Sequence, residues 1–100
     1  MWTKNKYYHE CRKRIFNYDP ENRCRTVQDG IYSYAIERAV AETKKMKNGY
    51  ERSEVITYIF FDKRGGCIKA AQELYFSERT VQRWENDFVN LVLKYSGNTE

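Results

Sequence analysis

The chain has 100 residues, 41% hydrophobic and 32% charged, which is typical of one globular domain large enough to bury a core. Lys and Arg outnumber Asp and Glu by 18 to 14, so the formal net charge of +4 permits a polyanionic partner without requiring one. One proline and five glycines argue against a β-sandwich with many turns, and no apolar run is long enough to span a membrane, so we expect a helical protein without membrane contact.

The first expected helix covers residues 3–18, where Tyr, Cys and Ile side chains recur at helical spacing between Lys and Arg. Asp19 and Pro20 predict its end, because proline cannot continue a helix. Asp29 and Gly30 predict a turn. The segment between these two signals has no clear period, so it is predicted mostly as loop.

Two further helices are expected in the middle of the chain. Residues 31–47 have a broad apolar face and end in lysines, an order that suits the helix dipole. Asn48 and Gly49 then predict a left-handed stop. Residues 50–63 contain β-branched side chains that leave a strand open, but the Glu-Arg-Ser-Glu lead and the length favour a helix. Gly65 and the glycine after it are expected to end that helix.

The fourth and fifth helices are expected at residues 67–75 and 78–95. Ser77 is a good N-cap for the last helix, and apolar residues recur along it by three and four from Val81 to Tyr95. This stripe also fits a dimer seam, but two heptads are few for a coiled coil. Packing against the second and third helices is therefore its expected use.

The sequence predicts an all-α fold, a compact five-helix domain over residues 1–100 with a C-terminal helix-turn-helix at residues 67–93. Such a unit needs small residues where its helices cross, and Ala70 and Ala71 provide them. Four apolar side chains are expected to fill the space between the two helices: Leu74, Phe76, Val81 and Trp84. The second helix of a helix-turn-helix lies in the DNA major groove. A plain helical hairpin with a solvated polar face is the alternative.

Seven side chains are the candidate DNA-binding residues. Five of them are expected to point outward on the second helix: Glu78, Arg79, Gln82, Arg83 and Asn86. Arg can make two hydrogen bonds to guanine, and Gln or Asn can do the same to adenine, so Arg79, Gln82 and Arg83 are expected to contact base edges. The other two suit phosphate oxygens: Lys69 and Thr80.

Two observations count against strong binding by one copy. Tyr75 occupies the turn position that glycine usually holds, and a positive φ there costs about 1 kcal/mol. Residues 67–100 carry four basic and five acidic side chains, so the positive potential comes from elsewhere in the chain. A single copy is then expected to bind double-stranded DNA weakly, which predicts a homodimer, a higher oligomer or a second DNA-bound partner.

The segment "AAQELYFSERTV" resembles region 4 of bacterial sigma factors, with Tyr75 in place of the glycine of that pattern. Over residues 31–93, which include "YAIERAV" and "VITYIFFDKRGGCIKAAQELYFSERTVQRWENDFVNLV", the chain is similar to small phage and prophage transcriptional regulators of the RinA/ArpU type. The resemblance implies an all-α protein that activates late phage genes through a C-terminal half like sigma region 4. It also implies that the residues from Ser77 to Trp84 open the recognition helix.

Two other functions remain open. One is a small terminase subunit that recognises a packaging site as a ring. The other is a module that docks on RNA polymerase and touches no DNA itself, which the acidic balance of the last third of the chain supports.

Other kinds of site have little support in the sequence. The residues His9, Cys11, Cys24 and Cys67 fit no familiar zinc spacing, and the chain has no nucleophile motif, Walker loop or H-E-x-x-H sequence. Three cysteines with neither a C-x-x-C pair nor a preceding secretory signal indicate reduced thiols in the cytoplasm. We therefore expect no enzyme activity, no metal and no cofactor.

Overall fold

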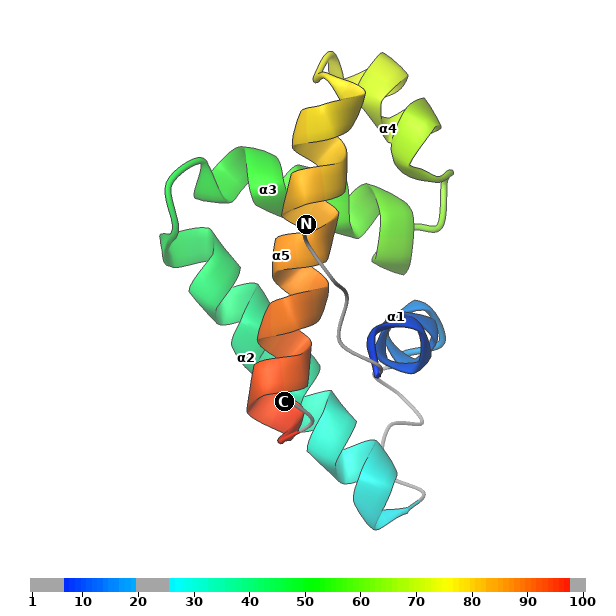
Figure 1. The fold of residues 1–100 in the computed structure, drawn as a ribbon, viewed down its shortest axis with the longest axis vertical. Helices are drawn as coiled ribbons and strands as arrows, with labels where there is room; N and C mark the ends of the chain where they lie inside the picture. The colour runs from blue at the N-terminus through cyan, green and yellow to red at the C-terminus, as the bar shows by residue number, and fades with distance from the viewer. Residues whose placement is uncertain (1–6, 20–25, 98–100) are drawn as a thin grey trace.

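The computed structural model describes residues 7–19 and 26–97, and in these two stretches every regular element is helical (Figure 1). The elements are α1 (Tyr8–Phe16), α2 (Val27–Lys45), α3 (Gly49–Ile56), the π-helical turn η1 (Thr57–Phe61), α4 (Cys67–Leu74) and α5 (Glu78–Ser96). This confirms the all-α fold with five α-helices. Among the described residues, no helix is both long enough and apolar enough to cross a bilayer.

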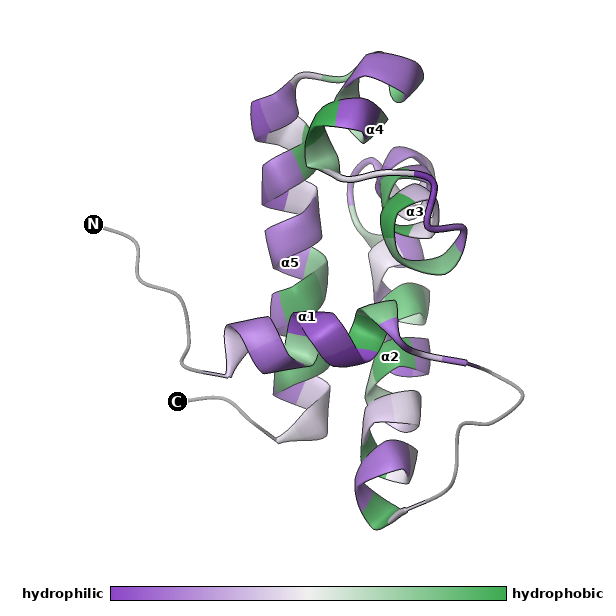
Figure 2. Ribbon diagram, turned by 90° about the vertical axis from the view of Figure 1, so that its right-hand side faces the viewer, coloured by the Kyte–Doolittle hydropathy of each residue, from purple (hydrophilic) through white to green (hydrophobic). Residues whose placement is uncertain are grey.

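The helix α5 is the centre of the fold, because α1, α2, α3 and α4 all contact it. It runs antiparallel to α2 along the long axis of the molecule, and α1 crosses both helices (Figures 1 and 2). Its apolar stripe forms the core rather than an exposed seam. Val81, Trp84 and Phe88 of the expected stripe are buried, whereas Leu91 and Tyr95 are half-buried. Three further residues complete the buried face of α5: Val89, Val92 and Leu93.

The first helix is shorter than the expected span of 3–18. It begins at Tyr8 and ends at Phe16, before the Asp19 that was expected to mark its end, and it buries Tyr8, Cys11 and Ile15. Residues 3–6 of the expected helix and Pro20 lie outside the described residues.

The turn predicted at Asp29 and Gly30 is wrong, because both residues lie in the first turn of α2. The helix begins four residues earlier than expected because Thr26 caps it: the Thr26 hydroxyl oxygen accepts a hydrogen bond from the Asp29 backbone N–H at 3.0 Å. The Asp29 carboxylate also lies near the positive end of the helix dipole. The Asp-Gly pair therefore lies inside the first turn of a capped helix and does not form a separate turn.

The stop after α2 is confirmed, and its left-handed residue is Asn48, with φ of +61°. Gly49 already belongs to α3, and it is needed there for a different reason. A Cβ atom at Gly49 would lie 2.3 Å from the Lys44 carbonyl oxygen, so only glycine lets the two backbones approach this closely.

The third expected helix is confirmed as helix rather than strand, but its last turn is a π-turn, η1. The Asp62 N–H bonds to the Thr57 carbonyl at 2.7 Å, five residues back. As a result the consecutive residues Phe60 and Phe61 both contact the Phe88 ring of α5, with centroid distances of 6.0 and 6.5 Å. The helix ends before the glycine pair, and the left-handed residue after it is Lys63.

Three residues separate α4 from α5, and their backbone follows a regular helix-ending pattern. Tyr75 has φ of +62°, as expected for a residue in place of glycine, and the Phe76 N–H bonds back to the Ala71 carbonyl at 3.0 Å. Ser77 then caps α5 by accepting from the Thr80 N–H at 3.1 Å.

The four apolar side chains expected between α4 and α5 are buried to different degrees, because Val81 and Trp84 are buried whereas Leu74 and Phe76 are half-buried. Ala70 and Ala71 of α4, which contacts α5, are buried as well. The Phe76 and Trp84 rings meet edge to face with their centroids 5.1 Å apart.

Replacing Tyr75 with glycine should stabilise the protein. The Tyr75 side chain is 93% exposed, so little packing is lost, while its left-handed backbone carries a steric cost. We expect the free energy of unfolding in urea to rise by about 0.5–1 kcal/mol, because the relief is partly offset by the greater freedom of glycine in the unfolded chain. Tyr75→Ala is the matched control, since it removes the ring but keeps the Cβ. Equal unfolding free energies for the two variants would contradict this account.

Candidate nucleic-acid interface

The amino-terminal half of α5 presents three exposed polar side chains that could bind a ligand. Arg79, Gln82 and Arg83 are all exposed, and in the two described stretches none of them makes an ion pair or a side-chain hydrogen bond. Figure 2 shows hydrophilic residues along this part of α5, beyond the point where α1 crosses it. Two guanidinium groups and one amide are therefore free to donate hydrogen bonds outward.

The start of α5 holds two more of the predicted residues. Glu78 is exposed in the first turn, where its charge favours the positive end of the helix dipole. Thr80 is half-buried, and its hydroxyl oxygen accepts a hydrogen bond from the Ser77 hydroxyl at 2.7 Å. The Thr80 proton remains able to donate to an anion beside the helix start.

The last two predicted residues have more restricted surroundings. Asn86 is half-buried, and its side-chain oxygen accepts a hydrogen bond from the Tyr8 hydroxyl of α1. Lys69 is exposed on α4, and its aliphatic stem lies over Gly65, where an added Cβ would be 2.7 Å from the Lys69 Cδ. The aliphatic stem of Lys69 thus lies near the loop before α4, whereas Asn86 forms part of the contact with α1.

An arginine from α1 neutralises a carboxylate on the inner side of α5. Arg12 Nε lies 2.6 Å from Glu85 Oε1, and Glu85 is only 7% exposed. The Arg12 guanidinium also lies over the Phe60 ring, 5.6 Å from its centroid. A buried carboxylate needs such a partner, because removal from water is costly for an unpaired charge.

An arginine from α3 does the same on the other flank of α5. Arg52 Nη1 lies 2.9 Å from Asp87 Oδ2, and Arg52 Nε donates to the Lys47 carbonyl at 2.9 Å. Its guanidinium lies 5.6 Å from the Trp84 ring centroid. Two of the carboxylates that make the last third of the chain acidic are therefore paired with cations from other helices.

Three weakly acidic groups around α4 and α5 keep their protons at neutral pH. Burial, with a further contribution from Glu85, raises the pKa of Tyr8 to about 12. Burial also raises the pKa of the Cys67 thiol, and burial with the hydrogen bond to Glu73 raises that of Tyr58. Each group thus acts as a donor. Cys67 donates to the Glu78 carbonyl at 3.6 Å, and Tyr58 donates to Glu73 at 2.7 Å.

A cavity of about 620 Å³ marks the border between α1 and the exposed face of α5. Its lining includes His9 and Arg12 of α1 and Gln82 and Asn86 of α5. Among the described residues its lining includes Gln82 but neither Arg79 nor Arg83. We therefore assign the candidate interface to Arg79, Gln82 and Arg83, with Lys69 and Thr80 beside them.

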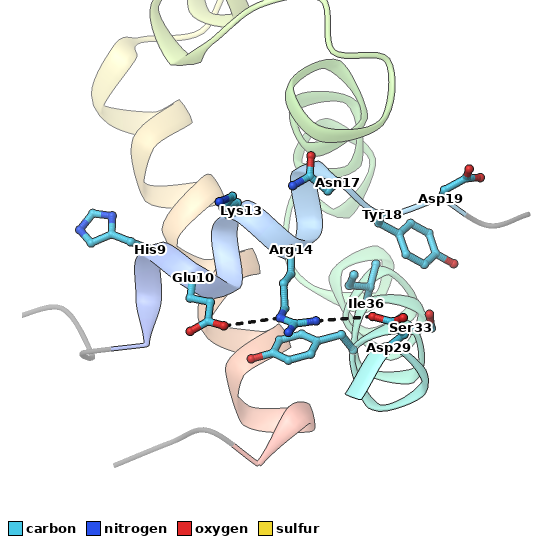
Figure 3. Close-up of a pocket in the computed structure, with 11 residues that line it drawn as sticks. His9, Glu10, Lys13, Arg14, Asn17, Tyr18, Asp19, Asp29, Ser33 and Ile36 are labelled. Atoms are coloured by element: carbon cyan, nitrogen blue, oxygen red, sulfur yellow. Dashed lines mark ion pairs between the residues drawn. The ribbon is translucent and has the colours of Figure 1, made fainter. Parts of the chain in front are cut away.

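A larger cavity of about 850 Å³ lies between α1 and the start of α2 (Figure 3). Arg14 reaches from α1 between two carboxylates, 3.7 Å from Glu10 and 3.6 Å from Asp29, and its guanidinium lies 4.7 Å from the Tyr32 ring centroid. These charges are satisfied within the chain. The cavity therefore belongs to the contact between the two helices and lies away from the α4–α5 turn.

Sequence reasoning missed the residues that hold α5 in place, which are Tyr8, Arg12 and Arg52. Their partners on α5 are 78, 73 and 35 residues away along the chain, and no local spacing links the members of a pair. A search for buried acidic residues on the apolar face of a helix could have identified Glu85 as needing a cation.

No group of three or more His, Cys, Asp or Glu side chains in the described stretches could hold a metal ion. Cys24, one of the four residues weighed for zinc, lies outside those stretches. Comparisons with protein-family models, with curated proteins and with solved structures found no match for this chain.

Replacing Arg12 with methionine should destabilise the protein by about 2–3 kcal/mol in urea unfolding, because Glu85 would be left buried without a partner. The partial exposure of Arg12 keeps the loss below that of a fully buried pair. Lys13→Met is the matched control, since this exposed neighbour should change stability by no more than about 0.5 kcal/mol. Adding Glu85→Gln to Arg12→Met should restore part of the loss. Equal effects of Arg12→Met and Lys13→Met would contradict the assigned role.

Proposed function

We propose that the chain is a sequence-specific DNA-binding transcriptional regulator that inserts the amino-terminal half of α5 into the major groove. The observation that carries the proposal is the set of three exposed, unpaired side chains on a capped helix: Arg79, Gln82 and Arg83. Guanidinium and amide groups can each make two hydrogen bonds to one base edge, so two arginines and a glutamine on one short stretch of helix are suited to recognising bases.

The arrangement of α4 and α5 supports this use. The major groove is about 12 Å wide and admits an α-helix. The helix can enter it only if neighbouring elements leave one of its faces exposed. The supporting helix α4 joins α5 through a three-residue turn, and the crossing is filled by Ala70, Ala71 and Val81. In this proposal α4 and α5 form a helix-turn-helix in which Lys69 and Thr80 bind phosphates.

The paired carboxylates remove part of the electrostatic objection. Glu85 and Asp87 are neutralised by Arg12 and Arg52, so they repel DNA less than their formal charges suggest. Glu78 stays exposed at the start of α5, and a glutamate can accept a hydrogen bond from a cytosine amino group.

We place the chain with phage-type activators of the RinA/ArpU type that carry a unit like sigma region 4. The support is the segment "AAQELYFSERTV", together with an all-helical fold in which these residues form two helices joined by a short turn. Tyr75 departs from the sigma pattern, yet it adopts the left-handed conformation that the glycine of that pattern supplies.

A second candidate function is docking on RNA polymerase without DNA contact. The observation that favours it is an exposed apolar pair at the ends of α4: Ile68 is 59% exposed and Tyr75 is 93% exposed. Exposed apolar side chains of this size are common in protein contacts and contribute little to phosphate binding.

The DNA-binding proposal predicts that a random-oligonucleotide selection with the purified chain enriches one site. Arg83→Ala should then weaken that site by about 5- to 150-fold, the cost of one bidentate base contact, and weaken unrelated DNA much less. Arg83→Lys keeps the charge without the fork, so it should lose the preference but retain binding to unrelated DNA. Lys94→Ala, at the far end of α5, is the control and should change neither. Equal losses on all sequences would make Arg83 a phosphate contact.

Salt dependence separates DNA binding from docking. The affinity of the wild-type chain for the selected DNA should fall steeply between low and moderate salt, and Lys69→Ala should reduce the slope of the log–log plot by about 1. If the chain binds no DNA at any salt concentration, the proposal is overturned and the docking function is favoured. In that case Tyr75→Ala should weaken binding to purified RNA polymerase.

A further inference from the structure

The helix α2 has an apolar stripe on the side that faces away from the core. Val27, Ile31 and Tyr34 are 83%, 39% and 57% exposed, and their spacing of four and three places them on one face. Beyond Tyr34 the same face holds Arg38, which donates to the Tyr34 hydroxyl at 3.1 Å, and the exposed Ala41. The opposite face of α2 is buried in the core through residues such as Ile36 and Ala39. An α-helix that is apolar on both sides is usually covered on both sides.

Gly30 lies beside this stripe, and nothing in the stretches that the structure describes requires glycine at this position. An added Cβ there would meet nothing within 4 Å, and its φ is not in the left-handed region. Glycine inside a helix is unfavourable relative to alanine. A residue without a side chain next to exposed Val27 and Ile31 leaves room for a second backbone to approach closely.

We propose that a second copy of this chain covers the stripe, and that two α2 helices meet there about a two-fold axis. In such an interface the same patch faces itself, so it must be complementary to itself in charge. Between Val27 and Tyr34 the one charged residue is Asp29, and Asp29 is paired with Arg14 on the side toward α1. Arg38 at the edge of the patch lies 4.0 Å from Glu42, so the cations beside the patch have anions next to them. Two chains of net charge +4 can therefore meet at this patch with little direct repulsion.

The available area indicates a weak dimer. A stable interface takes about 800 Å² from each partner, roughly one-eighth of the 6660 Å² that this chain exposes. The 19 residues of α2 span about 28 Å, and the apolar stripe occupies only the first half of them. Tyr95 at the end of α5 extends the surface, because Arg38 of α2 stacks over its ring at 5.1 Å. We expect dissociation at micromolar concentrations.

The location of the stripe leaves the candidate DNA contact free. The start of α2 and the turn between α4 and α5 lie at opposite ends of the molecule, along its long dimension of 38 Å (Figure 1). Both copies could therefore present Arg79 and Arg83 at the same time. The association itself does not depend on DNA, so it goes beyond the proposed function and can be tested without nucleic acid.

Sedimentation of the full chain without DNA tests the proposal. We expect a monomer–dimer equilibrium between about 1 and 500 μM. Val27→Glu should raise the dimer dissociation constant by about tenfold or more, because two carboxylates would be buried against apolar surface. Tyr50→Glu is the matched control: it adds the same charge at a 77% exposed residue of α3, and it should leave the dissociation constant unchanged.

Gly30→Ala separates dimerisation from folding. It should raise the thermal unfolding midpoint of the dilute monomer, since alanine favours the helix and meets no atom of its own chain, yet it should weaken the dimer. A wild-type chain that stays monomeric throughout the concentration range overturns the proposal. So does a dimer or ring that Val27→Glu and Tyr50→Glu weaken equally.

Discussion

Two arginines from different helices neutralise carboxylates on α5 near the middle of its length. Arg12 of α1 binds the nearly buried Glu85, and Arg52 of α3 binds Asp87 on the other flank. Because leaving a buried carboxylate without its partner is costly, the contact between α1 and α5 stabilises the fold. The position of the exposed half of α5 therefore depends on helices that come much earlier in the chain.

The same helix thus belongs to the core in one part and to the candidate interface in another. Its last residues, including Val92 and Leu93, are buried beside α2, whereas Arg79 and Arg83 are exposed near its start. A rigid helix anchored over most of its length holds its free end without requiring that end to pack against anything. Side chains positioned in this way lose less conformational freedom on binding than side chains on a loop.

The sequence predicted the number of helices and the exposure of Arg79, Gln82 and Arg83, because both follow from local apolar periodicity. It failed at Asp29 and Gly30, where the cap from Thr26 outweighs the turn preference of the Asp-Gly pair. It gave no warning that Asn86 would bond to Tyr8, since that contact joins residues 78 positions apart. Long-range pairs of this kind depend on how the helices pack, and no spacing within one helix records them.

The charge of the last third of the chain is a related case. Counting residues 67–100 alone gives more acidic than basic side chains, which suggested a poor surface for DNA. The folded chain places Arg12 and Arg52 against that segment, so the local field differs from the one that the segment would have alone. Net charge along a sequence is informative about an interface only when the segment is not paired across the fold.

The π-turn of η1 has a consequence for the direction in which α5 faces. Phe60 and Phe61 are neighbours in sequence, and each lies against the Phe88 ring. Deleting Phe61 would restore ordinary helical winding and leave Phe60 as the one ring of this turn against Phe88. The orientation of α5 about its own axis would then depend on one ring contact fewer, beside the ion pairs of Glu85 and Asp87, and the direction of its exposed end would become less sharply defined.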